Sequence, residues 1–112
     1  MHRSLIVAAA GVLIGAQAHA HDYPTAALAD YVFGCMASNG ETPQALEKCS
    51  CSIDVIASII PYKEYEAGET VLRMRQVRGG GEKMDLFRDT AVAKDAVDRL
   101  RRAQIEAELR CF

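Results

Sequence analysis

The chain has few of the residues from which catalytic and metal sites are usually built. Of its three histidines, only His21 follows the N-terminal leader described below. A Ser-His-Asp or Cys-His catalytic set would therefore have to use His21 as its only available histidine. The chain contains no Cys-x-x-Cys pair of the thioredoxin kind and no D-x-D-x-D-G calcium-loop spacing. These absences argue against triad hydrolases, dithiol enzymes and EF-hand proteins.

The chain also lacks a strong net charge and a second long apolar run. It has 13 Lys and Arg residues and 15 Asp and Glu residues, for a formal net charge of −2. Loss of the leader, which holds one arginine and no acidic residue, would make this charge −3. Such a weak acidic excess argues against nucleic acid as a partner. Beyond the leader, no segment approaches the roughly 20 apolar residues that a membrane span needs.

The first twenty residues have the pattern of a secretory signal peptide. Met1-His2-Arg3 is a short positive start, and residues 5–14 form an apolar run. Ala18-His19-Ala20 then places small residues where a signal peptidase reads them. The sequence therefore predicts a signal peptide over residues 1–20 and a single helical domain over residues 21–112, delivered to an oxidising compartment.

Four cysteines follow the leader, and in such a compartment we expect them to form two structural disulfides. Cys49 and Cys51 lie two positions apart on an expected helix, so they point about 200° away from each other. A helical hairpin turning near Glu41 favours Cys35–Cys49, which leaves Cys51 for Cys111. The pairing of Cys35 with Cys51 and of Cys49 with Cys111 stays open. A soft-metal site or an exchanging dithiol is the alternative use of these cysteines.

The apolar periodicity predicts an all-α fold, a small disulfide-stapled bundle of about four helices. Asn39-Gly40 is typical of a helix end, and Thr42-Pro43 of a new start with threonine as the N-cap. Pro61 ends the second helix, and Asp89 or Thr90 caps the last one. The expected helices cover about residues 25–39, 43–60, 63–77 and 90–111, with a short turn near 84–88.

The spacing of apolar residues also predicts which helix faces are buried. The third helix is expected to bury a stripe of Ala67, Val71, Met74 and Val77, and Gly68 counts against helix there. For the other helices, the expected buried residues are Leu28, Tyr31, Val32, Cys35 and Met36 in the first, Leu46, Cys49, Ile53, Ile56 and Ile60 in the second, and Ala93, Val97, Leu100, Gln104, Ala107 and Cys111 in the last.

An acidic cluster at the start of the third helix is a candidate metal site. Glu64, Glu66 and Glu69 offer the oxygen ligands that a hard cation such as calcium or a lanthanide prefers. Acidic side chains are also expected in a first helical turn because they complement the helix dipole. A solvated helix face is therefore the alternative interpretation.

A basic cluster at the end of the same helix is a candidate cofactor site. Arg73, Arg75 and Arg78 carry guanidinium groups suited to carboxylates and phosphates. The tricarboxylate pyrroloquinoline quinone (PQQ) would be one such ligand. Cations are also expected at a helix C-terminus, so an ordinary charged helix end is the alternative.

Three segments resemble a group of small exported helical proteins. They are residues 31–37 (YVFGCMA), residues 49–56 (CSCSIDVI) and residues 71–76 (VLRMRQ). The group is associated with gene neighbourhoods of PQQ-dependent alcohol dehydrogenases in Gram-negative bacteria, some of which use lanthanides. The resemblance implies a periplasmic location and an accessory role in quinoprotein-linked alcohol oxidation. It implies no catalytic residues.

The leading functional hypothesis is a non-enzymatic periplasmic accessory or binding protein of such an oxidation system. It would bind a periplasmic partner such as a quinoprotein dehydrogenase, deliver a metal ion, or handle the cofactor. The alternative is a structural or protective module, such as a small periplasmic chaperone or an enzyme inhibitor. A thiol–disulfide enzyme is the third hypothesis, and it requires an exposed, easily reduced cysteine pair.

Overall fold

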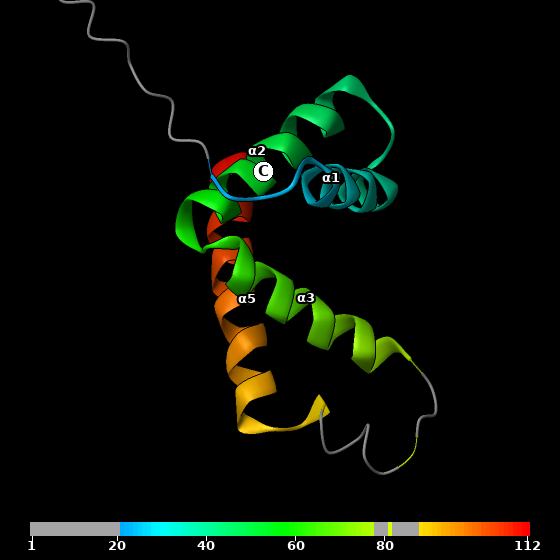
Figure 1. Ribbon diagram of the computed structural model, residues 1–112. Coiled ribbons are helices and arrows are strands. Elements are labelled where there is room, and N and C mark those ends of the chain that lie inside the picture. Colours follow the sequence, from blue (N-terminus) through cyan, green and yellow to red (C-terminus); the bar gives the residue numbers. More distant parts are fainter. Residues whose placement is uncertain (1–20, 78–80, 82–87) are drawn as a thin grey trace, which may run out of the picture.

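The computed structural model describes residues 21–77, 81 and 88–112 (Figure 1). Its helices are α1 (Thr25–Asn39), α2 (Pro43–Ile59), α3 (Tyr62–Gln76) and α5 (Ala91–Cys111). The expected all-α, disulfide-stapled bundle is thereby confirmed. The predicted signal peptide over residues 1–20 and most of the predicted turn near 84–88 lie outside the described residues.

Local sequence signals set the ends of these helices. The Thr42 hydroxyl accepts a hydrogen bond from the Ala45 amide at 3.1 Å, with Pro43 at the first helical position of α2. Thr90 caps α5 in the same way through the Ala93 amide, also at 3.1 Å. At the end of α1, Gly40 takes a φ of 102°, a backbone conformation that glycine adopts without strain. The predicted starts and stops of α1, α2 and α5 are therefore confirmed.

Helix α5 lies at the centre of the packing. It contacts both α2 and α3, whereas α1 packs mainly on α2 (Figure 1). The main core contains Ile53 and Ile56 of α2, Tyr65 of α3, and Leu100 of α5. None of the residues of α1 is fully buried. Helix α1 is therefore the least deeply packed of the four, and its attachment depends on partly buried side chains and a disulfide.

The buried face of α3 differs from the one that the apolar spacing predicted. Ala67 and Val77 are exposed, and the buried residues are Tyr65, Gly68 and Val71. A Cβ atom built on Gly68 would lie 2.8 Å from Leu100 Cβ. Glycine is what allows α3 and α5 to cross at this short separation. Of the predicted stripe, Val71 is buried as expected and Met74 is partly buried, whereas Ala67 and Val77 do not face the core. Leu46 of α2 is likewise exposed, contrary to expectation.

The segment that precedes α1 is part of the folded domain. The Asp22 carboxylate accepts a hydrogen bond from the Tyr62 amide at 3.1 Å, so a residue distant in sequence caps α3. The Tyr23 side chain is buried, and its hydroxyl donates to the Ile60 carbonyl at 2.8 Å. This bond satisfies a backbone group where α2 turns into α3. The residues just after the predicted cleavage position therefore fasten the α2–α3 corner.

No helix among the described residues is long and apolar enough to cross a membrane.

Candidate functional site

The three glutamates predicted as a metal site are not brought together. Glu64 and Glu66 lie two positions apart on α3 and so point to different sides of the helix. Glu64 forms an ion pair with Arg99 of α5 at 2.9 Å. Glu66 and Glu69 line a different hollow, next to α1. Among the residues that the structure describes, no group of three or more metal-ligating side chains is placed to hold an ion.

The predicted arginine cluster is only partly described. Arg73 of α3 forms an ion pair with Asp30 of α1, with 2.9 Å between Nη2 and Oδ2. Arg75 is exposed and lies two positions away, so it points to another side of α3. Arg78 lies outside the described residues. The described part of the cluster thus tethers α3 to α1 and offers no converging set of guanidinium groups.

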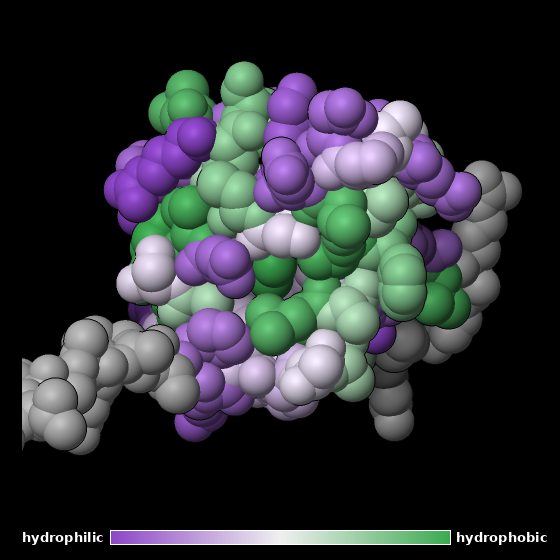
Figure 2. All heavy atoms as spheres, turned by 90° about the horizontal axis from the view of Figure 1, so that it is seen from above, coloured by the Kyte–Doolittle hydropathy of each residue, from purple (hydrophilic) through white to green (hydrophobic). Residues whose placement is uncertain are grey.

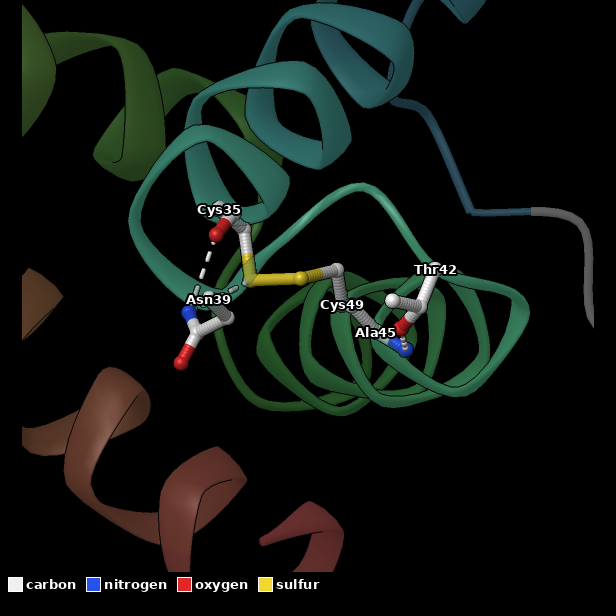
Figure 3. Close-up of a disulfide and its surroundings, with 5 residues drawn as sticks. All are labelled: Cys35, Asn39, Thr42, Ala45 and Cys49. Carbon is white, nitrogen blue, oxygen red and sulfur yellow. Dashed lines mark hydrogen bonds between the residues drawn. A yellow bond between two sulfur atoms is a disulfide. The ribbon is translucent and has the colours of Figure 1, made fainter.

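The four cysteines form two disulfides, Cys35–Cys49 and Cys51–Cys111. This is the pairing that the helical-hairpin argument favoured. Figure 3 shows the first bond joining α1 to α2, with the Asn39 amide donating to the Cys35 carbonyl at 2.9 Å. No cysteine is free. Two disulfides within one small domain fit an oxidising compartment outside the cytoplasm.

An open cleft of about 530 Å³ lies between α1, α3 and α5. We call it the tyrosine–carboxylate cleft. Its wall residues come from all four helices and the C-terminal residue: Asp30, Tyr31, Phe33, Gly34, Cys35, Ser38 and Asn39 of α1, Ser52 of α2, Tyr65 and Glu69 of α3, Gln104 and Glu108 of α5, and Phe112.

Tyr65 forms the floor of this cleft and carries an unused hydroxyl. The residue is only 5% exposed, and no hydrogen bond to its hydroxyl is found within residues 21–77 and 88–112. Burial is the main reason that the pKa of Tyr65 is raised. Electrostatic repulsion from Glu69, Tyr31 and Asp30, in decreasing order, adds to this shift. All three residues line the cleft together with Tyr65, and Tyr31 lines only this hollow, whereas Asp30, Tyr65 and Glu69 also border the hollow next to α1. The hydroxyl is not one of the fully buried atoms that lack a partner, so the small exposed part of this side chain leaves it within reach of a ligand atom.

Glu69 stands next to Tyr65, one helical turn along α3, and is half-buried. Burial raises the pKa of its carboxyl; Arg73 opposes this shift and Asp30 adds to it. Together with Glu108 on α5, the cleft holds three carboxyl groups and no Lys or Arg in its wall. Arg73 offsets one of these charges from outside, through its ion pair with Asp30. The cleft is therefore acidic overall and unsuited to the tricarboxylate PQQ.

Aromatic side chains stand at the mouth of the cleft. Phe33 of α1 is 72% exposed and the C-terminal Phe112 is 53% exposed. Lys48 Nζ lies 5.6 Å from the centre of the Phe112 ring, a cation–π arrangement. Two exposed phenylalanines beside an acidic cleft give the site both an apolar and an electrostatic surface.

A second, apolar groove of about 400 Å³ lies between α1 and α2. Its wall includes Leu28, Val32, Phe33, Leu46 and Ile53. Figure 2 shows the molecule from above, the side on which α1 and α2 lie in Figure 1, and hydrophobic side chains gather there with polar side chains around them. This groove contains little polar chemistry, so it can provide contact area but few directional bonds.

Sequence reasoning did not identify the tyrosine–carboxylate cleft. Glu69 was considered, but as one of three metal ligands at a helix start. The available signal was the helical spacing of Tyr65 with Glu69 and of Gln104 with Glu108, which places polar residues beside the core face of α3 and α5.

No family model, no curated protein and no solved structure matches this chain.

Proposed function

We propose that this protein is a non-enzymatic binding protein of the periplasm that recognises a partner through the tyrosine–carboxylate cleft. The observation that carries the proposal is Tyr65, a nearly buried residue that lines an open cleft and whose hydroxyl has no hydrogen-bond partner among the described residues. Two disulfides connect α1 and α5 to α2 and so hold the walls of this cleft in place. A preformed site loses little conformational entropy on binding.

The partner we propose is a quinoprotein alcohol dehydrogenase of the same compartment. The support for this choice is the resemblance of three segments to exported proteins encoded near such enzymes. Of the three accessory roles considered, the geometry favours partner binding. The three glutamates do not converge on one point, and the acidity of the cleft disfavours PQQ.

Binding of the purified protein to a PQQ-dependent alcohol dehydrogenase from the same host, followed by biolayer interferometry, tests this proposal. Phe112→Ser removes an apolar side chain from the mouth of the cleft and should weaken binding at least about tenfold, as expected for an exposed aromatic contact. Phe112 lines the cleft and not the groove between α1 and α2, whereas Phe33 lines both. The matched control is Val92→Ser, because Val92 is 80% exposed and lies outside the cleft wall. Equal affinity of both variants and the unaltered protein, or no binding at all, would refute the assignment.

The apolar groove between α1 and α2 favours a second candidate function, a small protective chaperone. Such a groove fits the apolar segments of an unfolded client. The distinguishing measurement is suppression of aggregation of an unrelated reduced protein, with Leu46→Ser as the variant. Leu46 lines the groove and not the cleft. Loss of suppression in this variant, with dehydrogenase binding absent, would favour the chaperone.

A further inference from the structure

We propose that the tyrosine–carboxylate cleft binds a positively charged alkylammonium or guanidinium group. This inference rests on the proposed function, since it names the chemical class that the same cleft takes. It follows from the charge of the wall, the free hydroxyl on the floor and the aromatic rings at the mouth, each of which is an independent observation.

The charge of the wall selects a cation. Asp30, Glu69 and Glu108 contribute carboxyl groups, and only Asp30 is paired with a described basic side chain, Arg73. Glu69 is half-buried, so its carboxylate has lost part of its hydration, and burial raises its pKa accordingly. A cation entering the cleft would replace this lost hydration with a charge-assisted hydrogen bond, which is stronger than a neutral one.

The floor of the cleft selects a cation that donates hydrogen bonds. The Tyr65 side chain is nearly buried, its hydroxyl lies close enough to Glu69 to feel its charge, and this hydroxyl can accept an N–H. An ammonium or guanidinium group carries several N–H donors, so it can engage Glu69 and Tyr65 together. A bare metal ion would need more oxygen ligands than the described residues bring together.

The mouth of the cleft selects a cation on an apolar stem. Phe33 and Phe112 offer exposed rings against which methylene groups can pack. Lys48 Nζ already lies over this ring, 5.6 Å from its centre, so the ring can accommodate an alkylammonium group in a cation–π arrangement. A lysine or arginine side chain of a partner protein has this form, and so does a free aliphatic diamine.

Titration with three probes, followed by backbone amide chemical shifts of the full-length protein, tests the inference and separates the two sources. The probes are N-acetyl-lysine methylamide, 1,4-diaminobutane and the uncharged N-acetyl-norleucine methylamide. Binding of the lysine derivative, with shifts at Tyr65 and Glu69, supports a partner side chain as the source. Binding of the diamine alone supports a free amine. Equal binding of the norleucine derivative, or no shifts with any probe, overturns the inference.

Two conservative variants and one control make the test specific. Glu69→Gln should weaken binding of the charged probe about tenfold, and Tyr65→Phe about fivefold, because each removes one polar contact and keeps the shape of the side chain. Glu41→Gln removes the same charge outside the cleft and should leave binding unchanged. If Glu69→Gln reduces the folded fraction by circular dichroism, Glu108→Gln on the exposed side of the same cleft replaces it. Unchanged affinity in the folded cleft variants overturns the inference.

This test is independent of the dehydrogenase. If the enzyme binds and the small cations do not, the ligand class is wrong and the proposed function remains. If the cations bind and the enzyme does not, the partner is wrong and the cleft chemistry remains.

Discussion

Gly68 of α3 packs directly against Leu100 of α5, where a Cβ atom on the glycine would lie 2.8 Å from Leu100 Cβ and 3.0 Å from the Ala96 carbonyl oxygen. The second of these neighbours is backbone, which cannot move aside without shifting α5. We therefore expect Gly68→Ala to lower the free energy of unfolding by about 1–3 kcal/mol, as overpacking does. Urea denaturation followed by circular dichroism measures this change.

Gly34 of α1 provides the matched control for this substitution. A Cβ atom at Gly34 would meet nothing within 4 Å. Gly34→Ala should therefore show only the helix-propensity gain, up to about 1 kcal/mol of added stability. If both alanine variants shifted the denaturation midpoint in the same direction, the close crossing of α3 and α5 would not be the reason for the glycine.

Loss of the Cys35–Cys49 disulfide should loosen α1 selectively. None of the residues of α1 is fully buried, so few other contacts hold it. In a variant with Cys35→Ala and Cys49→Ala, we expect amide hydrogen exchange in residues 25–39 to accelerate much more than in α3 and α5. Mass spectrometry of peptic fragments measures this. A uniform loss of protection over all four helices would contradict the prediction.

Tyr23→Phe should destabilise the domain by about 1–3 kcal/mol, because it leaves the buried Ile60 carbonyl without its partner. The ring, which also packs against Tyr62 and Tyr65, is kept. Tyr62→Phe serves as the control, since Tyr62 belongs to the same group of rings but is only partly buried. In thermal denaturation, the melting temperature of Tyr23→Phe should be lower than that of Tyr62→Phe. The reverse order would refute a structural role for the hydrogen bond from Tyr23 to Ile60.

Glu69 should make stability fall as pH rises. Burial raises the pKa of its carboxyl in the folded state, so the folded protein holds this proton more tightly than the unfolded chain. The stability that the protonated Glu69 carboxyl contributes is fully present below the ordinary glutamate pKa. This stability is lost as the pH rises through the raised pKa of the folded state. Glu69→Gln should flatten this decline. Urea midpoints measured between about pH 4 and pH 7 test it, with Glu41→Gln as the variant expected to follow the unaltered protein.

The sequence predicted helix boundaries better than helix faces. Thr42, Pro61 and Thr90 act through their immediate neighbours, so their effect is readable locally. The face of α3 depends on which helix it crosses and how closely. Gly68 counted against the helix by propensity alone, yet its lack of a side chain is what permits the contact with Leu100. That contact is long-range, and no local pattern contains it.

The tyrosine–carboxylate cleft was beyond sequence reasoning for the same reason. Tyr31, Tyr65 and Glu108 come from three helices whose relative placement is set by tertiary packing and by the disulfides. Glu69 was grouped with Glu64 and Glu66 because they are neighbours in sequence. The helix separates Glu64 from Glu69 and places Glu69 beside Asp30, a residue of another helix.

Cys111 is the last residue but one, and its partner Cys51 lies 60 positions earlier. In a chain that emerges N-terminus first, Cys35–Cys49 can close once 14 further residues have followed Cys35, whereas Cys51 must wait until the 60 residues up to Cys111 have emerged. During that interval Cys51 is a free thiol two positions from Cys49. Its thiolate can attack the Cys35–Cys49 disulfide and exchange the pairing. The order of emergence therefore leaves a time window in which an isomerase, or the speed of delivery itself, decides between the native and the exchanged cross-links.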